Sequence, residues 1–309
     1  MNRPYILLIF FMILAACSSL PPQPTSTSTP MPSPMPTATI LSLPPIFYIG
    51  GELPGADPQR FGESFFSGTF HSSPTFSPDG NTVWWAGEFS SATIYTSQFQ
   101  SNTWTEPEII SFSESISSYR DPFISPDGNR FYFISTLAIP GISPTSKENL
   151  WMMERQGEGW SEPQPLPPSI NDLSLHWTVS VANNYDLFFS AQEDGNAEIF
   201  QSRYINGAYT DPIQLEDPVN TESIEITPNI APDGSYMLFT RIASNRDQPY
   251  LYITFAVETG WSDPVRVDNI PYCISPIITP DRSFVIFMSS PGSFAWRDTT
   301  FIEDLRPEN

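Results

Sequence analysis

The chain has 309 residues, of which 34 are acidic and 13 are basic, so its formal net charge is −21 at pH 7. This excess of negative charge argues against nucleic acid or an anionic lipid surface as a partner. It is explained either by solubility outside the cell or by attraction of a cationic ligand or Ca²⁺. The two cysteines are Cys17 and Cys273. If Cys17 is modified, no disulfide can form, and stability must come from the apolar core.

The N-terminus has the pattern of a secretory signal. An Asn2-Arg3 start precedes an apolar run over residues 5–14, which is shorter than the about 20 apolar residues that span a membrane. The sequence Leu14-Ala15-Ala16-Cys17 resembles the lipobox of bacterial lipoproteins. The resemblance implies a signal peptide at residues 1–17 and a lipidated Cys17, which two anchoring chains would hold stably in a membrane. The alternative is an ordinary signal peptide with a chance cysteine.

Residues 18–43 are rich in Pro, Ser and Thr and contain no charged side chain. Such a segment cannot bury enough apolar surface to fold, and its prolines extend it. We therefore expect a stalk at 18–43, followed by one folded domain at 44–309. The predicted location is extracytoplasmic, lipid-anchored to the bacterial cell membrane or outer membrane.

A short turn motif recurs through the predicted domain. Its copies are Ser77-Pro78-Asp79-Gly80, Ser125-Pro126-Asp127-Gly128, Val181-Ala182-Asn183-Asn184, Ala231-Pro232-Asp233-Gly234 and Thr279-Pro280-Asp281-Arg282. The third positions are separated by 48, 56, 50 and 48 residues. A period in this range indicates a solenoid, a propeller or an array. Pro ends a paired strand, Asp bonds its own backbone and Gly accepts a positive φ, so the motif predicts a hairpin corner. Arg282 makes the fifth copy the degenerate one.

Each copy lies among short apolar runs that predict strands. One run precedes the turn, at 74–76, 122–124, 178–180, 228–230 and 276–278. A second, rich in aromatic and β-branched residues, follows it, at 83–85, 131–133, 187–189, 237–239 and 285–287. A third recurs at 94–95, 150–151, 199–200, 251–252 and 295–296. Runs of this kind are typical of strands that are packed on both faces.

A second motif leads into a fourth strand. It combines an aromatic, a hydroxyl, an acidic residue and a proline at 104–107, 160–163, 209–212 and 261–264. Four strands per repeat are typical of a propeller blade. The chain is therefore predicted to be all-β, a β-propeller with five visible repeats. The fifth repeat lacks the second motif, so we expect an N-terminal strand, Leu43 to Phe47, to pair with residues 295–302 and close the ring.

The Ser-Pro-Asp-Gly turn followed by an aromatic strand resembles the Pro-Asp repeat of TolB-like, WD-repeat-like bacterial β-propellers. The resemblance covers Ser72 to Leu305. Propellers of this type often have six blades, so a degenerate sixth blade within residues 48–70 is the alternative to five. The group includes both protein-interaction platforms and non-catalytic propeller halves of peptidases, and the resemblance therefore leaves the function open.

Motifs of known enzyme classes give little support for catalysis. Residues 77–84 approach the Ser-x-Asp-x-Gly-x-x-Trp box of sialidases, but Gly80 stands one place early and few arginines are present. The hydrolase domain that follows the propeller in related peptidases is not found in the sequence, and neither are His-Glu-x-x-His, Cys-x-x-Cys or a Gly-rich phosphate loop. We predict no catalytic residues, no metal and no cofactor.

The residues seven or eight places before each turn precede the innermost predicted strand. In a propeller this position lies at one mouth of the central channel, where ligands commonly bind. The polar and aromatic residues predicted to line this mouth are His71, Arg120, Asp121, His176, Trp177 and Glu225. The alternative is that they only satisfy local hydrogen bonds. A general acid-base pair of Glu225 and His176 is geometrically conceivable but is not required by the spacing.

Most tryptophans recur at fixed blade positions and are predicted to fill the core between blades. Trp177 breaks this pattern and is the tryptophan expected to contact a ligand. The function hypothesis is a non-enzymatic surface lipoprotein that binds a protein or a glycan at the channel mouth. The alternative is a secreted polysaccharide hydrolase or lyase with its site at the same mouth. We expect a monomer that touches the membrane only through its lipid and does not bind nucleic acid.

Overall fold

The computed structural model describes residues 45–87, 93–110, 119–139, 141, 147–192, 195–243 and 248–308, apart from the side chains of Tyr48, Leu175 and His176. They belong to one compact unit, Leu43–Asn309. The predicted signal peptide, Cys17 and the stalk at 18–43 lie outside the described residues. Within the described part, no helix is both long and apolar enough to cross a membrane.

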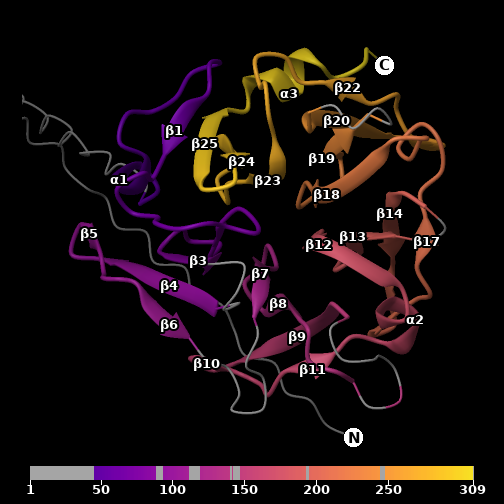
Figure 1. Ribbon diagram of the computed structural model, residues 1–309, viewed down its shortest axis with the longest axis horizontal. Coiled ribbons are helices and arrows are strands. Elements are labelled where there is room, and N and C mark those ends of the chain that lie inside the picture. Colours follow the sequence, from indigo (N-terminus) through magenta and orange to yellow (C-terminus); the bar gives the residue numbers. More distant parts are fainter. Residues whose placement is uncertain are drawn as a thin grey trace, which may run out of the picture. The chain divides into compact units, whose positions relative to one another are not determined.

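Five antiparallel sheets are arranged around a common centre, which confirms the predicted β-propeller with four-stranded blades (Figure 1). The first blade contains β2 (Thr75–Phe76), β3 (Thr82–Gly87), β4 (Thr93–Gln100) and β6 (Glu108–Ile110), with β5 (Thr103–Trp104) added to the end of β4. The second contains β7 (Arg120–Ile124), β8 (Arg130–Ser135), β9 (Asn149–Gln156) and β11 (Gln164–Pro165), with β10 (Gly159–Trp160) added to β9. These are the strands that the apolar runs predicted.

The remaining blades repeat this order. The third contains β12 (Ser174–Val181), β13 (Leu187–Gln192), β14 (Ala197–Ser202) and β17 (Ile213–Gln214), and a small hairpin of β15 (Tyr204–Ile205) and β16 (Ala208–Tyr209) precedes β17. The fourth contains β18 (Ile224–Ile230), β19 (Tyr236–Ile242), β20 (Tyr250–Val257) and β22 (Val265–Arg266), with β21 (Gly260–Trp261) added to β20. The fifth contains β23 (Ile274–Ile278), β24 (Phe284–Ser290), β25 (Ser293–Asp298) and β1 (Gln59–Phe61). Helices α2 (Pro168–Asn171) and α3 (Thr300–Asp304) are short.

An N-terminal strand closes the ring, as predicted, but the predicted segment was wrong. β1 pairs antiparallel with β25 through Gln59 opposite Trp296 and Phe61 opposite Phe294. Leu43 and Pro44 of the segment expected to pair lie outside the described residues; of the rest, Ile46 is buried and Phe47 begins α1 (Phe47–Gly50). Because proline has no N–H to donate to a ladder, the residues around Pro45 pack against the blades rather than pair with them. Residues 48–70 form no sixth blade.

The third copy of the turn is shifted by one residue from the predicted alignment. The bond from Gly80 N to Ser77 O, 2.8 Å, corresponds to a bond from Tyr185 N to Ala182 O, 2.9 Å. Tyr185 therefore takes the glycine position, with a φ of 64°. Its hydroxyl bonds Asp127, and its ring lies 4.0 Å from the guanidinium carbon of Arg130. These contacts offset the cost of a left-handed tyrosine.

The aromatic residues fill the spaces between blades, which confirms their predicted core role. Trp84, Trp85, Trp151 and Trp296 are buried, and Trp104, Trp160 and Trp261 are partly buried against the core clusters. Five clusters of buried side chains follow the ring of blades. Each blade therefore depends on its neighbours for burial, as expected of a repeat fold.

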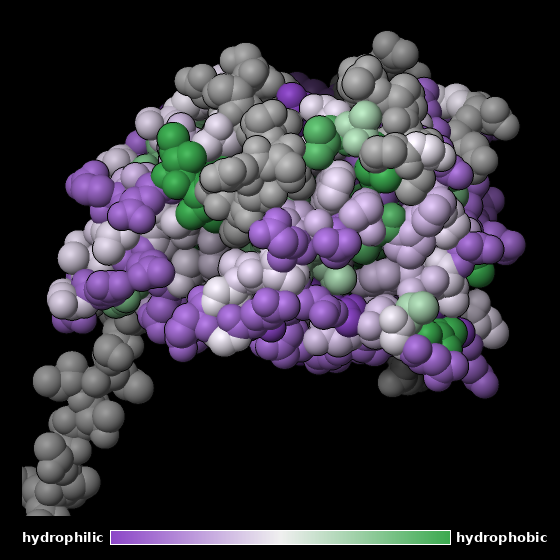
Figure 2. Space-filling view, turned by 90° about the horizontal axis from the view of Figure 1, so that it is seen from below, coloured by the Kyte–Doolittle hydropathy of each residue, from purple (hydrophilic) through white to green (hydrophobic). Residues whose placement is uncertain are grey.

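The outer surface is mostly hydrophilic in the view of Figure 2, and its hydrophobic residues lie in separate spots. The most exposed aliphatic side chains include Ile109, Ile213 and Val265, which lie on the outermost strands of three different blades. Single exposed aliphatic side chains are common on the surfaces of folded proteins and do not by themselves mark a binding surface.

Candidate functional site

The central channel of the propeller has two different ends, because the innermost strands of all five blades run along it in the same direction. The innermost strands β2, β7, β12, β18 and β23 all begin at one end and finish in the Pro-Asp turns at the other. We call the first end the strand-start mouth and the second the turn-side mouth. The residues predicted to bind a ligand belong to the strand-start mouth.

His71 and Asp121 form the centre of the strand-start mouth. His71 Nδ1 lies 2.8 Å from both carboxylate oxygens of Asp121, so the contact joins the first blade to the second. The His71 side chain is 10% exposed and that of Asp121 is fully buried. The sequence predicted both residues, and the structure brings them together.

Arg120 and Glu148 extend this pair within the second blade, with 3.6 Å between Arg120 Nη1 and Glu148 Oε1. Trp177 comes from the third blade. Its ring lies edge-on to His71, with the ring centroids 5.9 Å apart, and its backbone donates a hydrogen bond to the Glu148 carboxylate. These residues, which we call the His71 cluster, therefore connect three blades.

The electrostatics of the His71 cluster favour a charged histidine. Burial would lower the pKa of His71, but the charge and hydrogen bond of Asp121, together with the charge of Glu148, outweigh burial and raise it. The pKa of Glu148 is also raised, by burial and by the nearby Asp121 carboxylate, and His71 and Arg120 only partly oppose this. Two groups with shifted pKa values at one mouth are a pattern found at functional sites.

A repeated backbone irregularity positions these residues. β7, β12, β18 and β23 each contain a bulge, at which Asp121, Trp177, Thr227 and Ser275 adopt positive φ values of 47°, 59°, 52° and 54°. In the last two blades the bulged side chain accepts a hydrogen bond from the next blade: Ser275 N donates to Thr227 Oγ1 at 3.2 Å, and Ser73 N donates to Ser275 Oγ at 3.1 Å. Asp121 instead accepts from His71. The His71 cluster thus replaces a structural contact that the fourth and fifth blades keep.

Two buried hydroxyl groups next to His71 have no hydrogen-bond partner within the described residues, Ser72 Oγ and Ser73 Oγ. Buried polar groups are rarely left unpaired.

Glu225 does not join the His71 cluster. Its carboxylate lies 2.8 Å from Arg241 Nε and 2.7 Å from Thr221 Oγ1, and Arg241 also donates to the carbonyl groups of Pro218 and Val219. Burial raises the pKa of Glu225 although Thr221 and Arg241 oppose it. These contacts tie Glu225 to its own blade. His176 lies in β12, and its side chain is outside the described part, so its predicted pairing with Glu225 stays a prediction.

Sequence reasoning missed Glu148, because this residue does not belong to the column that precedes the turns. It lies just before β9, in the connection between the second and third strands of its blade. Strand alternation places that connection at the same end as the start of β7, so the predicted blade topology could have indicated it. Among the described residues, no group of three or more His, Cys, Asp or Glu is arranged to hold a metal ion.

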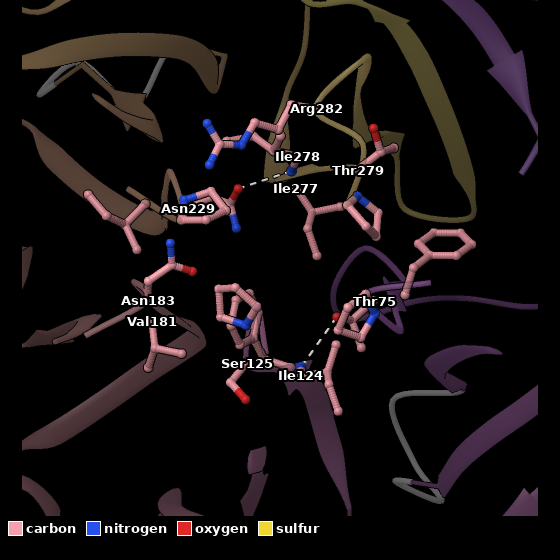
Figure 3. A pocket seen from close by; sticks show the side chains of 17 residues that line it. Thr75, Ile124, Ser125, Val181, Asn183, Asn229, Ile277, Ile278, Thr279 and Arg282 are labelled. Atoms are coloured by element: carbon pink, nitrogen blue, oxygen red, sulfur yellow. Dashed lines mark hydrogen bonds between the residues drawn. The ribbon is translucent and has the colours of Figure 1, made fainter. Parts of the chain in front are cut away.

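The turn-side mouth contains a cavity of about 260 Å³ (Figure 3). Its lining combines aliphatic side chains, Ile124, Val181 and Ile277 among them, with polar side chains and four turn prolines. The four prolines are Pro78, Pro126, Pro232 and Pro280. Nothing in the sequence analysis pointed to this cavity, since each of its residues was assigned to a strand or a turn.

No family model matches this chain, and no curated protein matches it significantly. Solved structures do. A protein assigned as TolB from Agrobacterium tumefaciens is 17% identical over 70% of this chain and 68% of that chain, with a TM-score of 0.48. TolB from Acinetobacter baumannii is 17% identical over 72% of this chain and 53% of that chain, with a TM-score of 0.48.

The endo-arabinase from Bacteroides thetaiotaomicron is 12% identical over 75% of this chain and 96% of that chain, with a TM-score of 0.50. At such identities the likeness concerns the fold alone, and propellers of this shape support both binding and catalysis. The propeller that the Pro-Asp turns predicted is shown by the sheet topology: the described part of the chain is a five-bladed β-propeller, and TolB-type propellers are among the solved structures to which it is similar.

Proposed function

We propose that the protein is an extracytoplasmic lipoprotein whose propeller binds a protein or a glycan at the strand-start mouth without transforming it. The observation that carries this proposal is the His71 cluster, in which the buried His71–Asp121 pair, 2.8 Å apart, lies edge-on to Trp177. Such a cluster offers what a polar ligand requires, namely fixed donors and acceptors beside an aromatic ring.

The positions of the partners explain why the cluster suits binding. His71 and Trp177 are only partly buried, whereas Asp121 is fully buried and holds the histidine ring. Because Asp121 is not exposed, it orients His71 rather than meeting a ligand itself. A ligand would therefore contact His71 and Trp177, and Asp121 and Glu148 would keep them in place.

The location rests on the N-terminal sequence. The Leu14-Ala15-Ala16-Cys17 pattern supports lipid attachment at Cys17, and residues 18–43 support a spacer between membrane and propeller. Mass spectrometry of the mature protein tests this directly. A lipid on an N-terminal Cys17, lost together with membrane association in Cys17→Ala, is the expected result, and a mature chain without lipid would contradict it.

Binding is tested by screening the full-length protein on a glycan array and by cross-linking it to envelope proteins. We expect Trp177→Ala to weaken binding of a hit about tenfold or more, because aromatic residues dominate binding energies. Trp160→Ala is the matched control, since Trp160 lies at the opposite end of a blade, in β10. Equal loss in both variants, at equal melting temperatures, would exclude the strand-start mouth.

A polysaccharide hydrolase or lyase is the second candidate, and one observation favours it. Glu148 has a raised pKa next to His71 and Asp121, as a general acid would. In an enzyme, His71→Ala, His176→Ala, Glu225→Ala or Glu148→Gln should each reduce turnover about 10²-fold or more per catalytic group. A binder would only lose affinity. Release of sugar ends from a panel of polysaccharides, with and without Glu148→Gln, distinguishes the two.

A further inference from the structure

The turn-side mouth contains a cavity and, at its wall, an amide donor that no described residue uses. Asn229 is 5% exposed, and its Oδ1 accepts a hydrogen bond of 3.0 Å from Ile278 N. Its amide nitrogen makes no hydrogen bond within the described residues and points into the cavity in Figure 3. Since buried amides are normally paired, this donor is available to an acceptor that enters the cavity.

The size and lining of the cavity limit what can enter. At about 260 Å³, it is slightly smaller than the ~300–1,000 Å³ typical of small-molecule sites. Val181, Ile124 and Ile277 from three different blades form its aliphatic wall. The cavity therefore fits one apolar side chain with an adjoining carbonyl group better than a large ligand.

The turns that supply the prolines also carry negative charge, because an aspartate directly follows each of these prolines. Their carboxylates, Asp79, Asp127, Asp233 and Asp281, are all exposed residues. Burial would raise the pKa of Asp79, Asp127 and Asp233, but hydrogen bonds from the turns lower it, so these groups are ionised at neutral pH. Arg282, the one cation among the cavity-lining residues of the described chain, is paired with Asp233 at 2.7 Å.

We propose that the turn-side mouth is a second binding site, which takes a basic segment of a partner protein. One aliphatic side chain of that segment fills the cavity, the adjoining backbone carbonyl accepts from Asn229, and flanking Lys or Arg side chains face the turn carboxylates. The net charge of −21 attracts such a segment over a longer range. This site is independent of the His71 cluster and of whatever binds there.

The test uses the full-length protein and a synthetic capped peptide, Lys-Gly-Leu-Gly-Lys, in isothermal titration calorimetry at low salt. Two matched peptides carry Gly in place of Leu, or Glu in place of both Lys. We expect binding of the first peptide and at least about tenfold weaker binding of each matched peptide. Raising the salt from about 0.01 M to about 1 M should weaken binding further, because it shortens the range of the charge interaction.

Variants of the protein test whether the peptide binds at the turn-side mouth. Ile277→Phe narrows the cavity and should weaken binding about tenfold or more. Asp79→Asn with Asp281→Asn keeps the shape of both turns and should weaken it about threefold at low salt. Asp268→Asn removes an exposed charge after β22 and is the matched control, expected to bind normally.

Methyl NMR of the unaltered protein gives a readout that does not depend on the variants folding. Peptide addition should shift the signals of Ile124, Val181 and Ile277. The proposal is overturned if the Lys-Gly-Leu-Gly-Lys peptide does not bind, or if the Gly-substituted peptide or Ile277→Phe binds equally well. It is also overturned if the methyl shifts lie elsewhere.

Discussion

The two mouths of the channel are built from the ends of the same five strands, yet they are chemically opposite. At the turn-side mouth the repeat is nearly kept, with a proline in four of five copies, and the cavity is lined by a mixture of aliphatic, proline and uncharged polar residues together with Arg282. At the strand-start mouth the blades contribute different residues: His71, Asp121 and Glu148 gather on the first two blades, and Glu225 pairs with Arg241 on the fourth. Residues that recur in every blade build the ring. Residues found in one blade only, such as His71 and Asp121, are not needed for the ring.

Asp121 illustrates the difference. At the equivalent bulge, Thr227 and Ser275 each use a neutral hydroxyl to join neighbouring blades. A buried carboxylate at this place requires a charged partner to offset its desolvation, and His71 supplies one. The fold could have been completed without an ion pair, so the ion pair needs another reason, for which ligand binding is the proposed one.

The contrast between the two mouths is tested most sharply by substituting one aspartate near each end of β7, Asp121 at the strand-start mouth and Asp127 at the turn-side mouth. We expect Asp121→Ala to reduce the free energy of unfolding by about 3 kcal/mol or more, because it leaves a buried His71 without its partner. Asp127→Asn, at the exposed turn after the same strand, should cost only about 1 kcal/mol or less. Urea unfolding measures both. Equal losses of unfolding free energy in the two variants would mean that the His71–Asp121 pair stabilises the protein no more than an exposed turn aspartate does.

The turn-side mouth has a structural amide of its own. Asn229→Ala removes the acceptor of Ile278 N, and we expect the free energy of unfolding to fall by about 1–2 kcal/mol, since a partly buried N–H is left unpaired. Asn183→Ala, at an exposed residue of the same cavity, is the control and should change stability by less than about 0.5 kcal/mol. A neutral Asn229→Ala in thermal or urea unfolding would show that water readily replaces this contact.

The repeated turn gives a pair of opposite predictions. Gly80 has a φ of 72° and open space around an added Cβ, so Gly80→Ala should destabilise by about 1 kcal/mol through backbone strain alone. Arg282, at a φ of 59°, should gain about 0.5 kcal/mol on Arg282→Gly after the loss of its exposed pair with Asp233. Calorimetric melting checks the two signs. A destabilised Arg282→Gly would mean that the ion pair outweighs the strain.

The smallest effect concerns pH. Because Asp121 raises the pKa of folded His71 above its ordinary value of 6.5, the pair stabilises the protein fully below pH 6.5 and loses this contribution as the pH rises through the folded pKa. We expect the stability difference between the unaltered protein and His71→Gln to shrink from pH 6 towards pH 9. A difference that is constant over this range would show that His71 is not charged in the folded protein.

Much of the fold was predictable because its signals are local. A Pro-Asp-Gly turn and an alternating apolar run act over a few residues, so Ser77 to Gly80 and β3 could be predicted without knowledge of the ring. The third turn was aligned one residue early because Tyr185 stands where the other copies have glycine or arginine. Only the hydrogen bond from Tyr185 N to Ala182 O shows that Tyr185 occupies the position of Gly80 in the repeated turn.

The sequence by itself determined the repeat, the four strands of each blade and the strand-start positions at which His71 and Asp121 lie, because each follows from residue type and spacing. Tertiary structure decided which N-terminal segment pairs with β25. It also decided that Glu148 lies near His71 and that Glu225 pairs with Arg241. It also left Asn229 facing an open cavity. These outcomes depend on which groups become buried together once five blades meet, and burial, unlike a turn, is a property of residues far apart in the chain.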